Sequence, residues 1–381
     1  MSAECEVPQT RNDYSALRDE VREFLKRELS DRAAPTLGRS WMGFDEAFSR
    51  KLGQRGWIGV TLPKRFGGMG AGPAVRQIIS EELLAASAPV SAHWIADRQS
   101  GPLILRYGTE AQQAALLPRI CRGELYFCIG MSEPNAGSDL AAITTRARLE
   151  DNHWRVNGAK VWTTNAHRSH YMIALVSTGE RIAGRHSGLS QLLIDLSLPG
   201  IHIRPIRDLA GGEDFSEVIF EDLRLPEDAL IGAEGHGWEQ VTAELAFERS
   251  GPERYLSSIL LLHMLIREIG PTPDPLQASI IGRLVARLCT LRHMSLAMAD
   301  KLEAGTGSAW DAPIVKDFGT EFEQDIPELA HLLDIAEPMS EGGCEFSQTL
   351  ALLLQIAPSF SLRGGTREIL RGIIARGLGL R

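Results

Sequence analysis

Apolar residues recur at helical spacing through the first third of the chain. In residues 13–29, Leu17, Val21 and Phe24 fall on one side of a helical period, so this segment is predicted to be an amphipathic helix. The same spacing predicts four more helices, over 44–56, 73–87, 93–107 and 109–123. We therefore expect an N-terminal helical domain over residues 1–123.

The pattern changes near residue 124, where apolar and polar positions begin to alternate. The segment WRVNGAKVW (154–162) reads as two alternating runs joined by Asn157-Gly158, a pair that favours a two-residue hairpin turn. Short runs separated by Gly and Pro turns predict four further strands, MIALVS (172–177), LSQLLIDL (189–196), IHIRPI (201–206) and SEVIFEDL (216–223). Residues 124–234 are thus expected to form a small barrel or sandwich.

Helical spacing returns from Trp238 onward. It predicts three long helices, over 238–269, 275–304 and 311–336, with Gly- and Pro-rich breaks between them. Residues 235–381 are therefore expected to form a helix bundle. The order of helices, strands and helices predicts an α+β chain of three domains.

Composition narrows the function classes. The chain of 381 residues has 44% hydrophobic and 23% charged residues, as ordinary globular proteins do, and its net charge of −9 argues against nucleic-acid binding. Five cysteines without a Cys-x-x-Cys pair argue against a disulfide framework and a zinc site, so we expect no metal. No apolar run approaches the roughly 20 residues of a membrane span, and the N-terminus lacks a signal pattern, so a cytoplasmic protein is expected.

Two polar segments carry the candidate chemistry. The loop MSEPNAGSD (131–139) supplies the hydroxyls of Ser132 and Ser138, and at Gly137 the backbone can approach a ligand closely. The segment Trp162-Thr163-Thr164-Asn165 adds a large ring and two hydroxyls at the end of a strand. Taken singly, the loop equally fits a plain connection with an Asx turn, and the second segment fits a strand end with a core tryptophan.

In this order and between two helical domains, the two segments resemble the flavin site of the acyl-CoA dehydrogenase family. The resemblance covers nearly the whole chain and includes RYGTEAQQAALLPRICRGE (106–124), LPEDALIGAEGHGW (225–238) and GGTREILRGIIARGLGL (364–380). It implies an N-terminal helical domain, a central β-barrel and a C-terminal four-helix domain, with FAD between barrel and bundle. It also implies an oxidoreductase that acts on acyl-CoA thioesters and passes electrons to an electron-transfer flavoprotein.

The resemblance assigns roles at the flavin ring residue by residue. Ser132 stands where a hydroxyl binds the ring, and Thr164 stands where a threonine faces the ring's reactive nitrogen. Trp162 is expected to pack beside the flavin, and Gly137 belongs to the same cofactor loop. Ser138 matches a position that touches the acyl-CoA or the flavin.

The same resemblance assigns roles in the C-terminal third. Thr366 and Glu368 fall in the segment that meets the nucleotide part of FAD, and the backbone N–H of Gly364 is expected to help polarise the thioester carbonyl. Arg249 and Arg254 are candidates for contacts with the phosphates of CoA.

Removal of a proton next to a thioester needs a base, and a carboxylate is the usual choice. The commoner family position for this base is Gly364 here, in LRGGTREI. The other position, used by isovaleryl-CoA and long-chain acyl-CoA dehydrogenases, precedes an Arg on the first long helix of the C-terminal domain, which makes Glu248 the candidate. Glu244 lies one turn earlier on the same face, Glu253 lies beyond a kink at Gly251-Pro252, and a solvated carboxylate paired with an Arg is the plain alternative.

Two family motifs that serve a neighbouring subunit's flavin are not recognisable. An Arg followed by Phe-Gly is missing from HMLIREIGPTPDPLQASI (263–280), and IAEPMSEGGCEFSQTL (335–350) replaces a Gly-Gly-x-Gly-Tyr segment. The chain therefore resembles the branch of actinobacterial heterotetramers whose substrates include CoA esters of steroid side chains. A homotetramer, a partner subunit with little activity of its own, and an acyl-CoA oxidase or flavin monooxygenase on the same fold are the alternatives.

Overall fold

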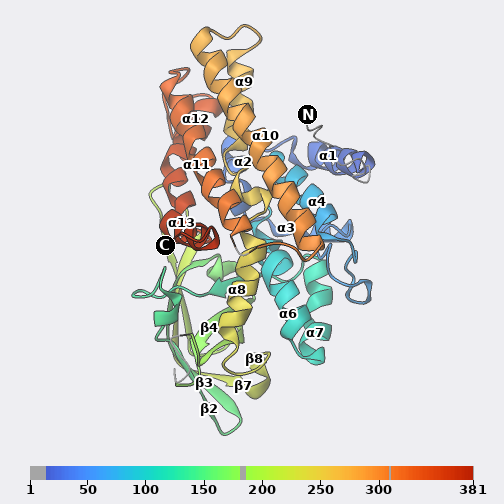
Figure 1. Cartoon of the computed structure of the whole chain (residues 1–381), viewed down its shortest axis with the longest axis vertical. Coiled ribbons are helices and arrows are strands. Elements are labelled where there is room, and N and C mark those ends of the chain that lie inside the picture. Colours follow the sequence, from blue (N-terminus) through green and yellow to red (C-terminus); the bar gives the residue numbers. More distant parts are fainter. Residues whose placement is uncertain (1–13, 181–185, 309, 381) are drawn as a thin grey trace.

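The computed structural model describes residues 14–180, 186–308 and 310–380, without the side chains of 244–248 and 303. Its N-terminal part is helical, as the spacing of apolar residues predicts (Figure 1). The helices are α1 (Ser15–Leu29), α2 (Ala34–Leu37), α3 (Glu46–Gln54), α4 (Pro73–Ala85), α5 (Ser91–Ile95), α6 (Gly101–Tyr107) and α7 (Glu110–Cys121). Helices such as α1 and α3 bury an apolar face and leave the opposite face to solvent.

The helix predicted over 93–107 contains a π-helical turn, Ala96–Ser100, between α5 and α6. Pro102 follows it in the first turn of α6 and lacks the N–H that regular α-helical bonding would use. The wider turn carries two buried charges, Asp97 and Arg98, toward the interior. The Asp97 carboxylate accepts a hydrogen bond of 2.6 Å from the N–H of Gly59.

The middle of the chain forms one eight-stranded sheet with the order β6-β7-β3-β2-β4-β5-β8, and β1 pairs with β4. Its strands are β1 (Phe127–Gly130), β2 (Arg146–Glu150), β3 (His153–Thr164), β4 (Tyr171–Ser177), β5 (Leu189–Asp195), β6 (Ile201–Ile206), β7 (Phe215–Pro226) and β8 (Leu230–Ile231). Inward residues such as Trp154, Met172 and Phe220 build a separate apolar core. The predicted order of helices, strands and helices is confirmed.

The hairpin predicted at Asn157-Gly158 is wrong. Strand β3 runs through this pair, and the turn into it lies at Asp151 and Asn152, whose φ values of 49° and 63° suit a tight hairpin. Gly158 instead sits at a register shift opposite β7 with φ 144°, where a Cβ would lie 2.6 Å from the hydroxyl of Thr145. The glycine therefore serves a bulge and a close approach.

The C-terminal third is helical again. Its helices are α8 (Gly237–Glu248), α9 (Ile259–Ile269), α10 (Pro275–Glu303), α11 (Asp311–Leu332), α12 (Glu345–Ile356) and α13 (Arg367–Gly377). A single helix over 238–269 is wrong, since Pro252 cannot continue helical bonding and a 3-10 turn, Pro252–Arg254, follows the break.

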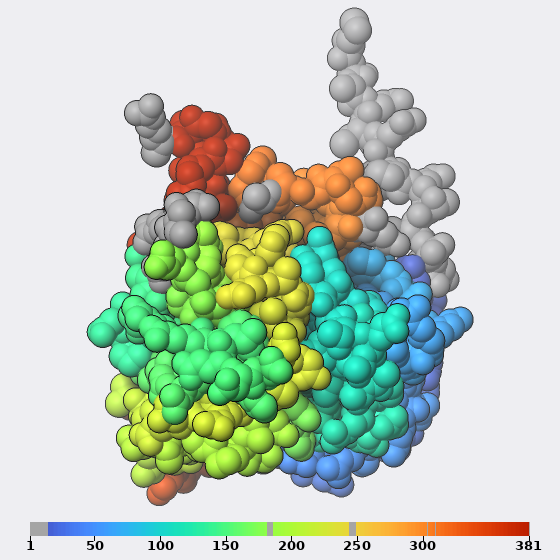
Figure 2. All heavy atoms as spheres, turned by 90° about the horizontal axis from the view of Figure 1, so that it is seen from below, coloured from blue at the N-terminus to red at the C-terminus, as the bar shows by residue number. Residues whose placement is uncertain are grey.

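The helices before and after the sheet share one core. Buried residues of α1 and α3 to α7 belong to the same apolar cluster as residues of α9 to α12, and Phe127, Ile173 and Ile231 of the sheet lie at its edge. Helix α8 contacts β5 and the π-helical turn, and Figure 1 shows it descending between the strands and α6. Figure 2 shows this yellow segment filling the seam between the green middle domain and the cyan helices.

Candidate functional site

The loop 131–139 is docked on the end of β3. The N–H of Val161 donates to the carbonyl of Ser132 at 2.9 Å, and Glu133 and Ala136 pair through two backbone hydrogen bonds. The loop that carries Ser132 therefore lies directly beside the strand end that carries Trp162 and Thr164. The structure brings together the two segments that the sequence analysis links.

A buried ion pair below this loop was missed by the sequence analysis. The Nζ of Lys160 lies 2.9 Å from Oε1 of Glu133 and donates to the carbonyl of Met131 at 3.2 Å. The backbone N–H groups of Thr144 and Thr145 donate to the same carboxylate at 2.6 and 2.9 Å. This ion pair therefore joins the loop 131–139 to strand β3.

The environment favours the charged form of Glu133. Burial alone would raise the pKa of its carboxyl, but Lys160 and the hydrogen bonds from Thr145 and Thr144 lower that pKa to about 2. Burial lowers the pKa of Lys160 to about 8, although Glu133 acts in the opposite direction. The sequence held one indication of this pair. If residues 153–164 are taken as one strand, the alternation of its side chains places Lys160 on the same buried face as Trp154 and Val156.

Trp162 occupies an unusual backbone position. Its φ is 57°, in the left-handed region, at a register shift between Lys160 and Thr163. Its side chain is 61% exposed and meets the ring of Phe215 edge-on, with centroids 6.3 Å apart. A strained backbone that presents a large aromatic ring to the outside is typical of ligand sites.

The neighbouring hydroxyls differ in burial. Thr164 is half-buried and pairs with Phe215 across the sheet, whereas the buried Thr163 hydroxyl has no hydrogen-bond partner among the described residues. Gly137 and Ser138 are exposed, and a Cβ at Gly137 would meet no atom within 4 Å. The loop thus has open space beside it and hydroxyl and N–H groups of the kind that bind the polar edge of a flavin.

Asn165 fixes the end of β3 to two other parts of the molecule. It adopts the left-handed conformation with φ 51°, which asparagine tolerates better than most residues. Its Nδ2 donates to the hydroxyl of Ser91 at 2.7 Å, and its N–H donates to the carbonyl of Asp214 at 2.8 Å. The end of β3 is therefore held both by Ser91 of α5 and by Asp214, the residue directly before β7.

The candidate base and the Gly364 loop meet at the end of α8. Glu248 is the last residue of this helix, and its side chain lies outside the described part of the chain. The next residue, Arg249, is 9% exposed, and its Nε donates to the carbonyl of Gly364 at 3.0 Å. The structure thus brings the segment of Glu248 next to Gly364, and contacts of Arg249 with CoA phosphates stay a prediction.

The rivals of Glu248 have different surroundings. The side chain of Glu244 also lies outside the described residues. Glu253 is 1% exposed and forms an ion pair of 2.9 Å with Arg98, beyond the break as predicted. Arg254 is buried at 3% exposure, which does not favour a contact with the solvated phosphates of CoA.

Thr366 and Glu368 lie at the start of α13. Thr366 is the N-cap residue, and Glu368 falls in the first turn. A backbone N–H and the Thr366 hydroxyl lower the pKa of the Glu368 carboxyl. The N–H groups of a helix start suit a phosphate in general, and the contact of this segment with the nucleotide part of FAD stays a prediction.

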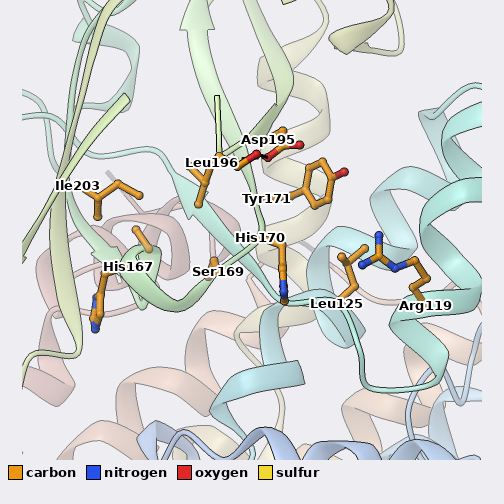
Figure 3. A pocket seen from close by; sticks show the side chains of 11 residues that line it. Arg119, Leu125, His167, Ser169, His170, Tyr171, Asp195, Leu196 and Ile203 are labelled. Atoms are coloured by element: carbon orange, nitrogen blue, oxygen red, sulfur yellow. Dashed lines mark hydrogen bonds between the residues drawn. The ribbon is translucent and has the colours of Figure 1, made fainter. Parts of the chain in front are cut away.

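An open pocket of about 450 Å³ lies where the segment after β3 meets α7 (Figure 3). Arg119 lines it from the N-terminal domain, with His167 and His170 after β3 and Asp195 at the end of β5. It includes none of the predicted site residues.

Two further classes of site were searched for in the described part of the chain. It holds no group of three or more His, Cys, Asp or Glu side chains that could share a metal ion. None of its helices combines the length and apolar character that a membrane crossing needs.

Comparisons with known proteins identify one family over most of the chain. Models of the N-terminal, middle and C-terminal domains of acyl-CoA dehydrogenases match residues 11–124, 128–223 and 272–379. Acyl-CoA dehydrogenase IpdE1 of Mycobacterium tuberculosis is 34% identical, over 97% of this chain and 98% of the relative.

Solved structures give the same picture. The Tcur3481-Tcur3483 steroid ACAD matches with a TM-score of 0.86 and 25% identity, over 98% of this chain and 99% of that one. The ChsE4-ChsE5 complex from Mycobacterium tuberculosis matches with a TM-score of 0.84 and 27% identity, over 98% of this chain and all of that one.

Proposed function

Since this chain belongs to the acyl-CoA dehydrogenase family of oxidoreductases, we propose that it oxidises a bulky acyl-CoA thioester to the 2-enoyl-CoA with FAD as its cofactor. One observation carries the proposal: the hydrogen bond from Val161 to Ser132 places the predicted flavin loop on the predicted flavin strand. A steroid-derived acyl group is favoured, because a solved structure similar over nearly the whole chain is described as a steroid ACAD.

The family is FAD-dependent, and the residues of this chain fit that cofactor. Ser132 and Thr164 offer hydroxyls, Trp162 offers an exposed indole, and Gly137 leaves open space beside the loop. FAD, when bound, supplies the acceptor for the hydride that leaves the β carbon of the substrate. The buried Glu133–Lys160 pair keeps loop and strand in register for this task.

Glu248 is proposed as the base that takes the proton from the α carbon. Its place at the end of α8, one residue before Arg249, supports this role, since Arg249 reaches the Gly364 loop. The Gly364 N–H is proposed to bind the thioester oxygen and so to make the α proton more acidic. Helix α8 ends at Glu248, and the break at Gly251–Pro252 that follows keeps the chain from continuing as a helix, which supports space for a wide acyl group.

A related chain is proposed as the partner, in a heterotetramer with two copies of each subunit. The ChsE4-ChsE5 structure is described as a complex, and this chain lacks the two family motifs that serve a neighbouring flavin, in 263–280 and 335–350. An electron-transfer flavoprotein is the proposed acceptor. An oxidase on this fold is the second candidate and would be recognised by rapid reoxidation of the reduced flavin by oxygen.

The test is expression of the chain with and without a related chain encoded beside it. Flavin absorption measures FAD loading, and anaerobic bleaching is followed with straight-chain, branched and steroid side-chain acyl-CoAs. We expect bleaching by bulky acyl-CoAs, and a Glu248→Gln variant that bleaches about 100- to 10,000-fold more slowly.

Glu239→Gln, an exposed carboxylate in the first turn of the same helix, is the matched control and should bleach like the wild type. Unchanged bleaching in Glu248→Gln would refute the base. Full FAD loading and activity of the single chain on straight-chain acyl-CoAs would refute the heteromeric, bulky-substrate proposal.

A further inference from the structure

Arg249 joins two segments that are far apart in the sequence. It follows Glu248 at the end of α8, and its Nε donates to the carbonyl of Gly364, 115 positions away, at 3.0 Å. Both segments carry proposed chemistry: the base on one side and the N–H that binds the thioester oxygen on the other. A single guanidinium thus links the two groups that must act on neighbouring atoms of one substrate.

The glycines of the loop leave room for this contact. Gly364 and Gly365 have φ values of 67° and 98°, in the region that favours glycine. A Cβ on Gly365 would lie 3.3 Å from Nη2 of Arg249, tighter than an ordinary contact. The two glycines therefore let the backbone of the loop pass close to the Arg249 guanidinium.

The residue before the two glycines is also held. The Nη2 of Arg363 donates to Oε2 of Glu323 at 2.6 Å and to the hydroxyl of Ser257 at 2.7 Å. Its guanidinium lies 4.8 Å from the ring centroid of Trp41. Arg363 fixes the loop on its N-terminal side, so the free rotation that remains is that of the Gly364 and Gly365 peptides.

Arg249 removes that remaining freedom. A hydrogen bond from a charged donor to the Gly364 carbonyl fixes the orientation of the peptide plane between Gly364 and Gly365, and so restricts the ψ angle of Gly364. Because Arg363 is held on one side and the Gly364 carbonyl on the other, the Gly364 N–H between them has little freedom to change direction. Preorganised donors of this kind account for much of the stabilisation of developing oxyanions.

We propose that Arg249 is a positioning residue that holds the Gly364 loop in register with the base helix, rather than a ligand of the CoA phosphates. The inference rests on the function proposed above. Its 9% exposure and its bond to Gly364 support this role, because the CoA phosphates stay near solvent while this guanidinium is buried. Loss of Arg249 should then affect the chemical step more than binding.

The experiment compares Arg249→Met, Arg249→Lys and wild type in the FAD-loaded complex. We expect kcat to fall about 10- to 100-fold in Arg249→Met with KM changed less than about threefold. Lysine keeps the charge but lacks the planar fork, so Arg249→Lys should recover only part of kcat. Arg287→Met, which removes a guanidinium paired with Asp325 between α10 and α11, is the control and should leave kcat unchanged.

Two readouts separate positioning from general damage. In the bound enoyl-CoA product of an acyl-CoA that bleaches the wild-type flavin, the infrared stretch of the thioester carbonyl should move toward its free value in Arg249→Met but not in Glu248→Gln. Amide hydrogen exchange over residues 363–370, measured without substrate, should be faster in Arg249→Met only.

The outcomes are distinguishable. A raised KM with unchanged kcat would assign Arg249 to CoA binding and overturn the proposal, as would unchanged hydrogen exchange. If no acyl-CoA bleaches the wild-type flavin, the proposed function fails, while hydrogen exchange still decides whether Arg249 holds the loop.

Discussion

Glu133 and Lys160 form a buried ion pair of 2.9 Å that connects the loop before the sheet's second strand to the middle of β3. Both side chains are almost fully buried, and Thr144 and Thr145 complete the carboxylate's hydrogen bonds. The pair holds the loop of Ser132 against the strand of Trp162, so a substitution that removes the ion pair should reduce both the stability of the protein and its affinity for the flavin.

Lys160→Met should lower the free energy of unfolding by about 3–5 kcal/mol, because it leaves the Glu133 carboxylate buried without its cation. The double variant Lys160→Met with Glu133→Gln should recover a large part of that loss. Urea unfolding of the apoprotein measures both. Lys51→Met, which removes an exposed partner of Glu28, should cost less than about 1 kcal/mol, and an equal cost at the two positions would contradict the buried-pair argument.

The same carboxylate predicts a stability loss in acid. The pKa of Glu133 is about 2 in the folded chain against a usual 4.5, so the unfolded chain binds its proton first. Its contribution is complete above pH 4.5 and is lost as the pH falls toward 2. Glu133→Gln should remove this part of the pH dependence of urea unfolding, and a parallel pH profile in the variant would be evidence against it.

His93 predicts a second acid-sensitive step at higher pH. Burial lowers its pKa from 6.5 to about 3, and its Nδ1 lies 2.8 Å from the hydroxyl of Ser49. The unfolded chain therefore gains a proton below pH 6.5 that the folded chain rejects, so stability should fall by up to about 1.4 kcal/mol per pH unit from this group. His93→Gln should flatten the slope of unfolding free energy between pH 6 and 4, and an unchanged slope would speak against the assignment.

Trp162 should separate flavin binding from folding. Because its φ of 57° is costly for a side chain but not for glycine, Trp162→Gly should leave the apoprotein as stable or more stable by about 1 kcal/mol. The same variant should lose FAD more readily, which the ratio of flavin to protein absorption measures after gel filtration. Equal FAD retention would show that the indole does not contact the flavin.

Gly365 should tolerate no side chain. Its φ of 98° and the nearby Arg249 guanidinium predict that Gly365→Ala destabilises the protein by about 1–3 kcal/mol and lowers kcat. Gly372→Ala, inside α13, is the control and should stabilise by up to about 1 kcal/mol. Thermal unfolding and steady-state rates compare the two, and similar effects at both positions would contradict the role of the left-handed turn.

Local patterns predicted the elements that depend on local forces. The amphipathic period predicted a helix over 13–29, and the structure has α1 at Ser15–Leu29. This works because the apolar face that a helix buries is visible as a periodic pattern in its own sequence. The alternation in 201–206 identified β6 in the same way. The loop of Ser132 and the strand end of Trp162, which the resemblance assigns to one site, are joined by the hydrogen bond from Val161 to Ser132.

Long-range contacts explain what the sequence analysis missed. Asn157-Gly158 has the composition of a turn, and only the pairing with β7 makes it a bulge inside one strand. The partner of Lys160, Glu133, lies 27 positions earlier in the chain, so the ion pair could not be predicted before β3 was known to be one continuous strand. The contact of Arg249 with Gly364 joins chain segments 115 positions apart, and no periodicity encodes such a distance.

The apolar cluster shared by the first and last thirds of the chain has a consequence for biosynthesis. Among the N-terminal helices, α4 and α2 leave the ribosome with faces that are later covered by α10 and α12. The middle domain, with a core of its own, can fold while the last third is still being translated. These two faces therefore stay exposed until the last third of the chain has been synthesised, and a chaperone that shields them should raise the yield of this chain more than one acting on the sheet.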